Sequence, residues 1–361
     1  MKKIIIVLLL LLNVCINVNA TNTSTIVMDV DSGRILYQNN AYERRLIAST
    51  TKIMTFIIAY EYGKEFLDVE VEAGEEVLKM YGTSIYLSYK EKMTLRDLLY
   101  GLMLRSGNDA AVVIANFIGG SEEKFVELMN KKANFLGMHN TTFNNPHGLD
   151  EETQNYSTAY DMAKLSQYAN KIPFYQEVTS TKYYKTQTEN KAYSWTNRNK
   201  LVFNYDNFIS GKTGYTPSAG KTFVSTAKKD NLILTTVSLN DANIYDNHKL
   251  LYEEMFNKYE KYCVVNYKTF PIKSQTKNNK AYIKENIYYP VKENEKENIS
   301  IKIILNNENR NNVIGELKAY YKEQEIKSIN IYQELDNKKK EENFLEKVKK
   351  FFIRIFTVIA Y

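Results

Sequence analysis

Cysteine and histidine are scarce in this sequence, which excludes two common kinds of site. Only two of the 361 residues are cysteine and three are histidine. Cys15 falls in an expected signal peptide, so Cys263 alone would remain and no intramolecular disulfide can form. His139, His147 and His248 are too far apart for metal-ligand spacing, and we expect neither a metal site nor another cofactor. We expect His147 to be a structural residue of a turn-rich loop.

The N-terminus has the pattern of a secretory signal peptide. Lys2 and Lys3 precede an apolar run over 4–12, and Val18 and Ala20 suit cleavage after residue 20. A lipoprotein site at the one cysteine of this segment is the less favoured alternative, because small residues do not precede it. We therefore expect residues 1–20 to be removed and the mature protein to act outside the cytoplasmic membrane.

Excess charge of one sign and long apolar runs are missing from the body of the chain. The net charge of +6 comes from the two lysines of the signal peptide and from 338–361, which holds seven Lys/Arg and three Glu, so the remainder is neutral. This distribution argues against nucleic-acid binding.

The apolar run over 351–361 would be about 16 Å long as a helix, too short for a hydrocarbon core of roughly 30 Å. Its one-sided pattern predicts an amphipathic helix over 337–361 that anchors the protein to the outer face of the cytoplasmic membrane, with docking on the globular part as the alternative.

Ser49 and Lys52 form the first chemical motif. They open an apolar helical run that extends to residue 60, and residues three apart share a helix face, so the amine can lie beside the hydroxyl. A lysine whose pKa is lowered by burial or by a second cation can act as the base that a nucleophilic serine needs. Apolar residues lie on nearly all sides of this helix, which predicts that it crosses the core. The same spacing occurs at four places to which we assign no chemistry: Ser121/Lys124, Ser218/Lys221, Ser225/Lys228 and Ser274/Lys277.

Two further motifs follow in order. Residues 106–108 read Ser-Gly-Asn and separate two apolar helical segments, and residues 212–214 read Lys-Thr-Gly, which occurs nowhere else in the chain. Taken alone, the first could be an ordinary loop in which Asn108 or Asp109 caps the next helix. The ordered set of three motifs, however, is typical of penicillin-binding proteins and serine β-lactamases.

Hydrophobic periodicity predicts a mixed domain followed by a β-rich one. The first combines an antiparallel sheet with amphipathic helices, and the second has short alternating runs separated by polar turns and carries no catalytic residue. We expect strands over 24–30, 34–37, 208–214, 220–227 and 232–239, helices over 95–103, 122–137, 157–168 and 242–258, and further strands near 282–283, 299–304, 313–320 and 326–332. Thr94 should cap the helix that follows it, and Ser157 or Thr158 should cap the helix expected over 157–168.

The chain resembles low-molecular-mass penicillin-binding proteins of the D-alanyl-D-alanine carboxypeptidase family. The matching stretches are 31–37, 48–55, 95–111, 145–149, 197–199 and 211–217. The resemblance implies an α/β (α+β) catalytic domain of the serine β-lactamase/penicillin-binding transpeptidase-like fold, with helices flanking an antiparallel sheet. It also implies a small all-β C-terminal domain and an amphipathic C-terminal helix. The expected division is a signal peptide over 1–20, the catalytic domain over 21–262, the β-rich domain over 263–336 and the anchor over 337–361.

The same resemblance implies catalytic roles for three residues. Ser49 would attack the penultimate D-Ala carbonyl of a peptidoglycan stem peptide ending in D-Ala-D-Ala and form an acyl-enzyme. Lys52 would be the general base, kept partly neutral by the nearby Lys212 cation. Ser106 would relay the proton to the leaving amine. Water would then hydrolyse the ester, and β-lactam antibiotics such as penicillin would trap Ser49.

Substrate binding is implied for four more positions. Asn108 would bind the substrate amide, Lys212 and Thr213 the substrate carboxylate, and the backbone N–H groups of Ser49 and Tyr215 would form the oxyanion hole. Many family members carry an arginine before the helix after the third strand. Residues 241–245 (Asp-Ala-Asn-Ile-Tyr) lack it, so Lys212 and Thr213 would have to suffice or Arg198 would contribute.

Three other functions use the same fold. A D,D-endopeptidase would employ the same residues on cross-links. A serine β-lactamase of class A would need a further glutamate for deacylation, and no Glu-x-x-Leu-Asn follows the second motif. A non-catalytic wall protein is conceivable because of the missing arginine, but the complete motif set argues against it.

Overall fold

The computed structural model describes residues 23–272, 280–310 and 312–334. The expected signal peptide and the expected amphipathic helix over 337–361 lie outside these residues. The described residues divide into two compact units, one up to Asn257 and one from Lys258 onward. Across the described parts of both units, no helix combines the length and the apolar character needed to cross a bilayer.

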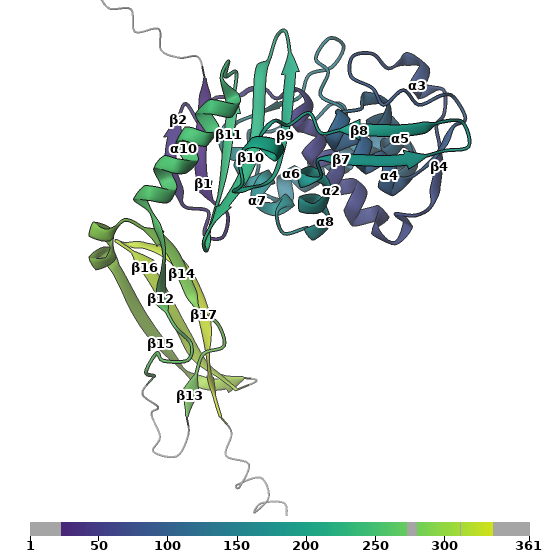
Figure 1. Ribbon diagram of the computed structural model, residues 1–361. Helices are drawn as coiled ribbons and strands as arrows, with labels where there is room; N and C mark the ends of the chain where they lie inside the picture. The colour runs from purple at the N-terminus through teal and green to yellow at the C-terminus, as the bar shows by residue number, and fades with distance from the viewer. Residues whose placement is uncertain (1–22, 273–279, 311, 335–361) are drawn as a thin grey trace, which may run out of the picture. The chain divides into compact units, whose positions relative to one another are not determined.

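A five-stranded antiparallel sheet forms the centre of the first unit (Figure 1). The two ends of the unit's chain meet in it, because β1 pairs with both β2 and β11. The strand order places β9, which carries the Lys-Thr-Gly motif, at one edge. In the order β2-β1-β11-β10-β9, the strands span Ile35–Asn39, Ser24–Asp29, Leu232–Leu239, Gly220–Lys229 and Phe208–Thr216.

Helices cover both faces of this sheet. Successive strand residues point to opposite sides, and consecutive residues of the central strands β1, β10 and β11 are buried, so both faces must be covered. On one face, Ser166 of α7 (Ala159–Ala169) accepts a hydrogen bond from Thr235 at 2.8 Å. On the other, His248 Nδ1 of α10 (Ile244–Lys258) lies 2.7 Å from Ser225 Oγ. The sheet is therefore the middle layer, and both of its faces are buried.

A largely helical part adjoins the α7 face, and α2 (Lys52–Gly63) runs through its core. Eight consecutive residues of α2, from 52 to 59, are buried, as the apolar pattern predicts. The remaining elements of this unit are β3 (Arg45–Leu46), η1 (Ala48–Thr51), η2 (Lys64–Phe66), β4 (Glu70–Glu72), α3 (Glu76–Lys79), β5 (Lys92–Thr94), α4 (Leu95–Tyr100), η3 (Gly101–Arg105), α5 (Asn108–Gly119), α6 (Glu122–Phe135), β6 (Tyr156–Ser157), α8 (Pro173–Ser180), β7 (Tyr183–Gln187), β8 (Ala192–Thr196) and α9 (Leu201–Asn204).

Helix ends near the motifs follow the sequence only in part. Thr94 caps α4 by accepting from Asp97 N, and Thr158 caps α7 by accepting from Asp161 N, which confirms both predictions. The alternative that Asn108 or Asp109 caps α5 is wrong, because Gly107 occupies the cap position and gives no side-chain bond. Both polar side chains have other partners, described below.

The second unit is a small β domain, as the sequence predicts. Its four-stranded sheet has the order β13-β17-β16-β15, and β12 pairs with β14 in a two-stranded sheet. Apolar side chains such as Ile287, Leu317 and Ile331 form its core. Its elements are β12 (Glu260–Val265), β13 (Ala281–Tyr282), β14 (Ile287–Val291), η4 (Glu293–Asn298), β15 (Ile299–Arg310), β16 (Val313–Tyr321) and β17 (Gln324–Gln333).

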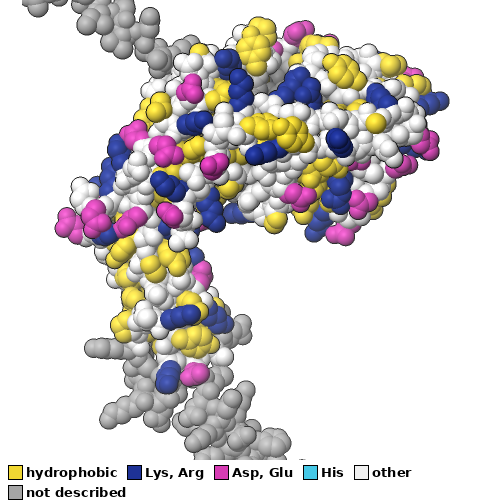
Figure 2. All heavy atoms as spheres, viewed as in Figure 1, with side chains coloured by type: hydrophobic (Ala, Val, Ile, Leu, Met, Phe, Trp, Pro, Cys, Tyr) yellow, Lys and Arg dark blue, Asp and Glu magenta, His cyan; other side chains and the backbone are white. Residues whose placement is uncertain are grey.

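Charged side chains are mixed on the surface. On the face of the first unit shown in Figure 2, basic and acidic groups alternate with apolar ones and form no extended patch of one sign. This mixture agrees with the neutral balance of the chain between its two basic ends.

Candidate active site

The fold brings the three sequence motifs to one place. Ser49 lies in η1, a short 3-10 turn, rather than in the helix itself, and Lys52 is the first residue of α2. Residues three apart also stand over each other in a 3-10 turn, so the predicted contact forms, with Lys52 Nζ 3.0 Å from Ser49 Oγ. Asn108 Oδ1 lies 2.7 Å from the same nitrogen, which joins the second motif to the first.

Lys52 is held in an environment that favours its neutral form. The residue is fully buried, and burial together with the nearby Lys212 cation lowers its pKa well below the usual value, while Asp109 acts in the opposite direction. Its two other contacts are the Asn108 Oδ1 atom and the His147 carbonyl oxygen, at 2.6 Å. Neither atom can donate, so when Lys52 is neutral its two protons are used on these two acceptors. The nitrogen lone pair then faces the Ser49 hydroxyl, which is the arrangement of a general base.

Lys212 connects the third motif to the second. Its ammonium group donates to Ser106 Oγ at 3.0 Å and to the Thr213 carbonyl at 2.6 Å. Burial and the Arg198 guanidinium lower the pKa of Lys212 to about 7. Ser106 can therefore exchange a proton with a group whose pKa is close to neutral pH.

The second motif is fixed by the turn that precedes it. Helix α4 continues as a π-helical turn, η3, and ends at Ser106, whose φ of 63° lies in the left-handed region. The Thr83 hydroxyl donates to the Ser106 carbonyl at 2.7 Å, and the Thr83 carbonyl accepts from Asn108 N at 2.8 Å. Asn108 Nδ2 donates to the Tyr81 carbonyl at 2.7 Å, which fixes the amide orientation so that Oδ1 faces Lys52.

Glycines allow the backbone to approach the Ser49 turn closely. A Cβ on Gly214 would lie 2.8 Å from Ser49 N, and one on Gly148 would lie 2.0 Å from the Ala48 carbonyl oxygen. The glycine of the third motif thus lets the edge strand β9 run against the serine. Thr213 and Tyr215 flank it on this strand, and the Tyr215 side chain is largely exposed.

His147 is part of the site through its backbone, which the sequence did not predict. Its carbonyl binds Lys52, while its ring Nδ1 accepts from Leu149 N at 3.1 Å. Burial and the nearby Lys52 lower the pKa of the imidazole to about 3, so it is neutral. Asn145, which accepts from both His147 N and Gly148 N, holds this turn. The predicted structural role of His147 agrees with these contacts, and its carbonyl also binds Lys52.

Comparison with known proteins gives the family. The family model described as D-alanyl-D-alanine carboxypeptidase matches residues 15–243. The chain belongs to this family. A second model, described as the C-terminal domain of penicillin-binding protein 5, matches residues 254–339. Together they confirm the resemblance inferred from the motifs.

Curated relatives and solved structures agree with this assignment. D-alanyl-D-alanine carboxypeptidase DacF of Bacillus subtilis (strain 168) is 40% identical over 213 residues, 58% of this chain and 54% of the relative. DacC of Escherichia coli (strain K12) is 36% identical over 225 residues, 59% of this chain and 55% of the relative. The chain thus spans about half the length of these relatives. Penicillin binding protein 5 from Haemophilus influenzae superposes with a TM-score of 0.72 at 26% identity, covering 86% of this chain and 95% of that one. The likeness confirms the predicted fold of the two described units.

The arginine found in many family members is absent, and another cation lies near the site. Asp241 occupies the start of the matching segment, where it accepts from Asn243 N and Asn247 Nδ2. Burial and the nearby Arg198 lower the pKa of Lys212, and burial and the nearby Arg105 lower the pKa of Arg198. Lys212 and Arg198 therefore lie near each other beside the third motif, with Arg105 near Arg198.

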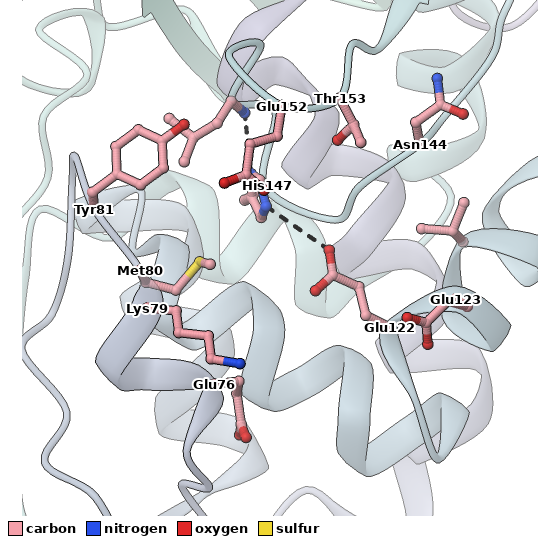
Figure 3. Close-up of a pocket in the computed structure, with 12 residues that line it drawn as sticks. Glu76, Lys79, Met80, Tyr81, Glu122, Glu123, Asn144, His147, Glu152 and Thr153 are labelled. Carbon is pink, nitrogen blue, oxygen red and sulfur yellow. Dashed lines mark hydrogen bonds and ion pairs between the residues drawn. The ribbon is translucent and has the colours of Figure 1, made fainter.

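A cavity of about 650 Å³ adjoins the site (Figure 3). His147 and Tyr81, whose carbonyls bind Lys52 and Asn108, both line it. Four glutamates, Glu76, Glu122, Glu123 and Glu152, also line it. Burial and neighbouring carboxylates raise the pKa of Glu122, whose Oε1 lies 3.9 Å from His147 Nε2. Over residues 23–272, 280–310 and 312–334, no group of three or more His, Cys, Asp or Glu side chains is arranged to hold a metal ion.

Proposed function

We propose that this protein is a serine-type D-alanyl-D-alanine carboxypeptidase that removes the terminal D-Ala of peptidoglycan stem peptides through an acyl-enzyme on Ser49. The observation that carries the proposal is the fully buried Lys52, whose amine lies 3.0 Å from Ser49 Oγ and is bound by two fixed acceptors. Such an amine can remove the serine proton at neutral pH.

In the acylation step, Ser49 Oγ attacks the penultimate D-Ala carbonyl as Lys52 takes its proton. The backbone N–H groups of Ser49 and Tyr215 stabilise the oxyanion, and the close approach of β9 at Gly214 supports this pairing. Loss of one such donor costs about 3 kcal/mol of transition-state stabilisation in other enzymes.

In the departure step, the leaving amine needs a proton. Ser106 supplies it and is recharged by Lys212, its neighbour at 3.0 Å. Asn108 Nδ2 uses one proton on the Tyr81 carbonyl and has a second for the substrate amide. Lys212 and Thr213, with Arg198 beside them, bind the terminal carboxylate. Water then hydrolyses the acyl-enzyme.

The remaining parts of the chain are assigned on the sequence. We propose a signal peptide over 1–20, a catalytic domain over 21–262, a β-rich domain over 263–336 and a membrane-surface anchor over 337–361. The enzyme would then act on the wall outside the cytoplasmic membrane. A β-lactam would be attacked as substrate and remain bound to Ser49.

Labelling with a fluorescent penicillin tests the proposal. We expect a long-lived adduct, mapped by mass spectrometry to Ser49, no adduct with Ser49→Ala, and release of D-Ala from a pentapeptide substrate. An adduct lost within seconds would favour a β-lactamase. Labelling of Ser49→Ala equal to the parent, or a folded parent that neither labels nor releases D-Ala, would refute the proposal.

A further inference from the structure

Tyr86 has an unusual backbone and an exposed ring. Its φ is 65°, in the left-handed region that bulky residues rarely adopt, and the residue is 74% exposed. Its neighbours Ile85 and Leu87 are 2% and 8% exposed. Burial of the ring therefore does not compensate the strain at Tyr86. Backbone strain that packing does not explain is often found at functional sites.

The surrounding structure holds this conformation firmly. The buried Asp109 carboxylate accepts from Ile85 N and Leu87 N, both at 3.0 Å, on either side of the tyrosine. Ser84 Oγ donates to the same carboxylate and accepts from Tyr86 N at 2.7 Å. The Lys191 ammonium donates to the Tyr86 carbonyl. The ring is thus directed outward from a fixed loop.

This loop lies on the leaving-group side of the proposed site. Asp109 directly follows Asn108, and Thr83 binds the backbone of both Ser106 and Asn108. Arg198 N donates to the Leu104 carbonyl, two residues before Ser106. The loop that carries Tyr86 therefore lies beside Ser106, which would protonate the departing residue, and the segment that carries Arg198 is bonded to the same turn.

We propose that Tyr86 is a specificity-determining residue that limits the leaving group to a small D-amino acid with a free carboxylate. The inference rests on the proposed function and extends it. A terminal D-Ala presents only a methyl group beyond its carboxylate, whereas the leaving residue of a peptide cross-link carries a second stem peptide. A tyrosine ring carried by a fixed loop at this side excludes the longer group and admits the shorter one, which separates carboxypeptidase from endopeptidase activity.

The role of Tyr86 is tested with the full-length protein by comparing two substrates that differ only in the leaving residue. Release of the C-terminal residue is measured as kcat/KM for a pentapeptide ending in D-Ala-D-Ala and for one ending in D-Ala-D-Leu, in the parent, Tyr86→Ala and Tyr86→Phe. Tyr62→Ala is the matched control, since Tyr62 is 56% exposed near the far end of α2. We expect Tyr86→Ala to lower the preference for D-Ala over D-Leu by about tenfold, the size of effect that hydrophobic exclusion gives. Tyr86→Phe and Tyr62→Ala should keep the parent's preference, and Tyr86→Ala should also cleave a cross-linked dimer.

The outcomes separate the two proposals. If Tyr86→Ala labels with penicillin and releases D-Ala but keeps the parent's preference within about twofold, Tyr86 does not set specificity and the proposed function is unaffected. Equal loss of preference in Tyr62→Ala would likewise overturn the assignment. A parent that releases no D-Ala would overturn the proposed function, and this inference with it.

Discussion

Replacement of Asn108 by aspartate should convert the proposed base into a cation. Asn108 Oδ1 lies 2.7 Å from Lys52 Nζ, and the amide is nearly the same size and shape as a carboxylate. Asn108→Asp therefore introduces one negative charge at this contact with little change of volume. An opposite charge at this distance favours the protonated lysine, so the Lys52 pKa should rise.

The size of this rise follows from the distance. At 2.7 Å and an effective dielectric constant of about 20, the attraction is about 6 kcal/mol, which is an upper limit of about four pKa units. The new carboxylate would also lose the donor to the Tyr81 carbonyl and face that oxygen instead, which offsets part of the gain. We expect a net rise of about two pKa units or more, which corresponds to about 3 kcal/mol.

The pH dependence of penicillin acylation measures this shift. Acylation requires neutral Lys52, so its rate falls on the acid side as the lysine becomes protonated. Asn108→Asp should move this acid limb to higher pH by about two units, so that the rate at pH values on the parent's acid limb falls by about a hundredfold. Asn108→Ala is the control, because it removes the acceptor without adding charge and should not move the limb upward. An acid limb at the parent's position in Asn108→Asp would refute the idea that Lys52 acts as a neutral base.

Two further predictions concern the backbone and Arg198. Gly148→Ala should lower the free energy of unfolding by about 3 kcal/mol or more and reduce acylation, because its Cβ would lie 2.0 Å from the Ala48 carbonyl, whereas Gly120→Ala, also at positive φ but with no atom within 4 Å, should lose about 1 kcal/mol. Equal thermal stability of the two variants would contradict this. Arg198→Gln should raise the KM for pentapeptide about tenfold with a smaller change in kcat. The pH profile of D-Ala release should have an alkaline limb where Lys212 loses its proton. Arg198→Gln should move this limb to higher pH, since the guanidinium helps to lower the Lys212 pKa. An unchanged KM would show that Arg198 does not bind the carboxylate.

The sequence predicted those parts of the molecule that local pattern controls. The burial of α2 followed from apolar residues on all its sides, and the caps at Thr94 and Thr158 followed from residue type. The hairpin of β7 and β8 was missed, although Tyr193 and Trp195 alternate with exposed neighbours. Its loop over 188–191 (Thr-Glu-Asn-Lys) contains no glycine or proline, so the usual turn signal is absent.

The site could be predicted only as far as its motifs. The spacing of Ser49 and Lys52 brings them into contact in either a 3-10 turn or an α-helix. The contact was therefore predicted correctly, although Ser49 lies in a 3-10 turn and not in the expected α-helix. The protonation state of Lys52 depends instead on Asn108 and on the His147 carbonyl, 56 and 95 residues away in the chain. A backbone carbonyl has no sequence signature, because every residue carries one.

The same limit applies to Tyr86. Its exposure and left-handed backbone arise because Asp109, 23 positions further along the chain, binds the amides on both sides of it. At the sequence level Asp109 was one of two candidate caps, and its side chain instead fixes the loop that carries the tyrosine. Motifs therefore identify the reacting groups. The groups that set the charge of these residues and limit the size of the leaving group are placed by buried polar contacts, which only the folded chain contains.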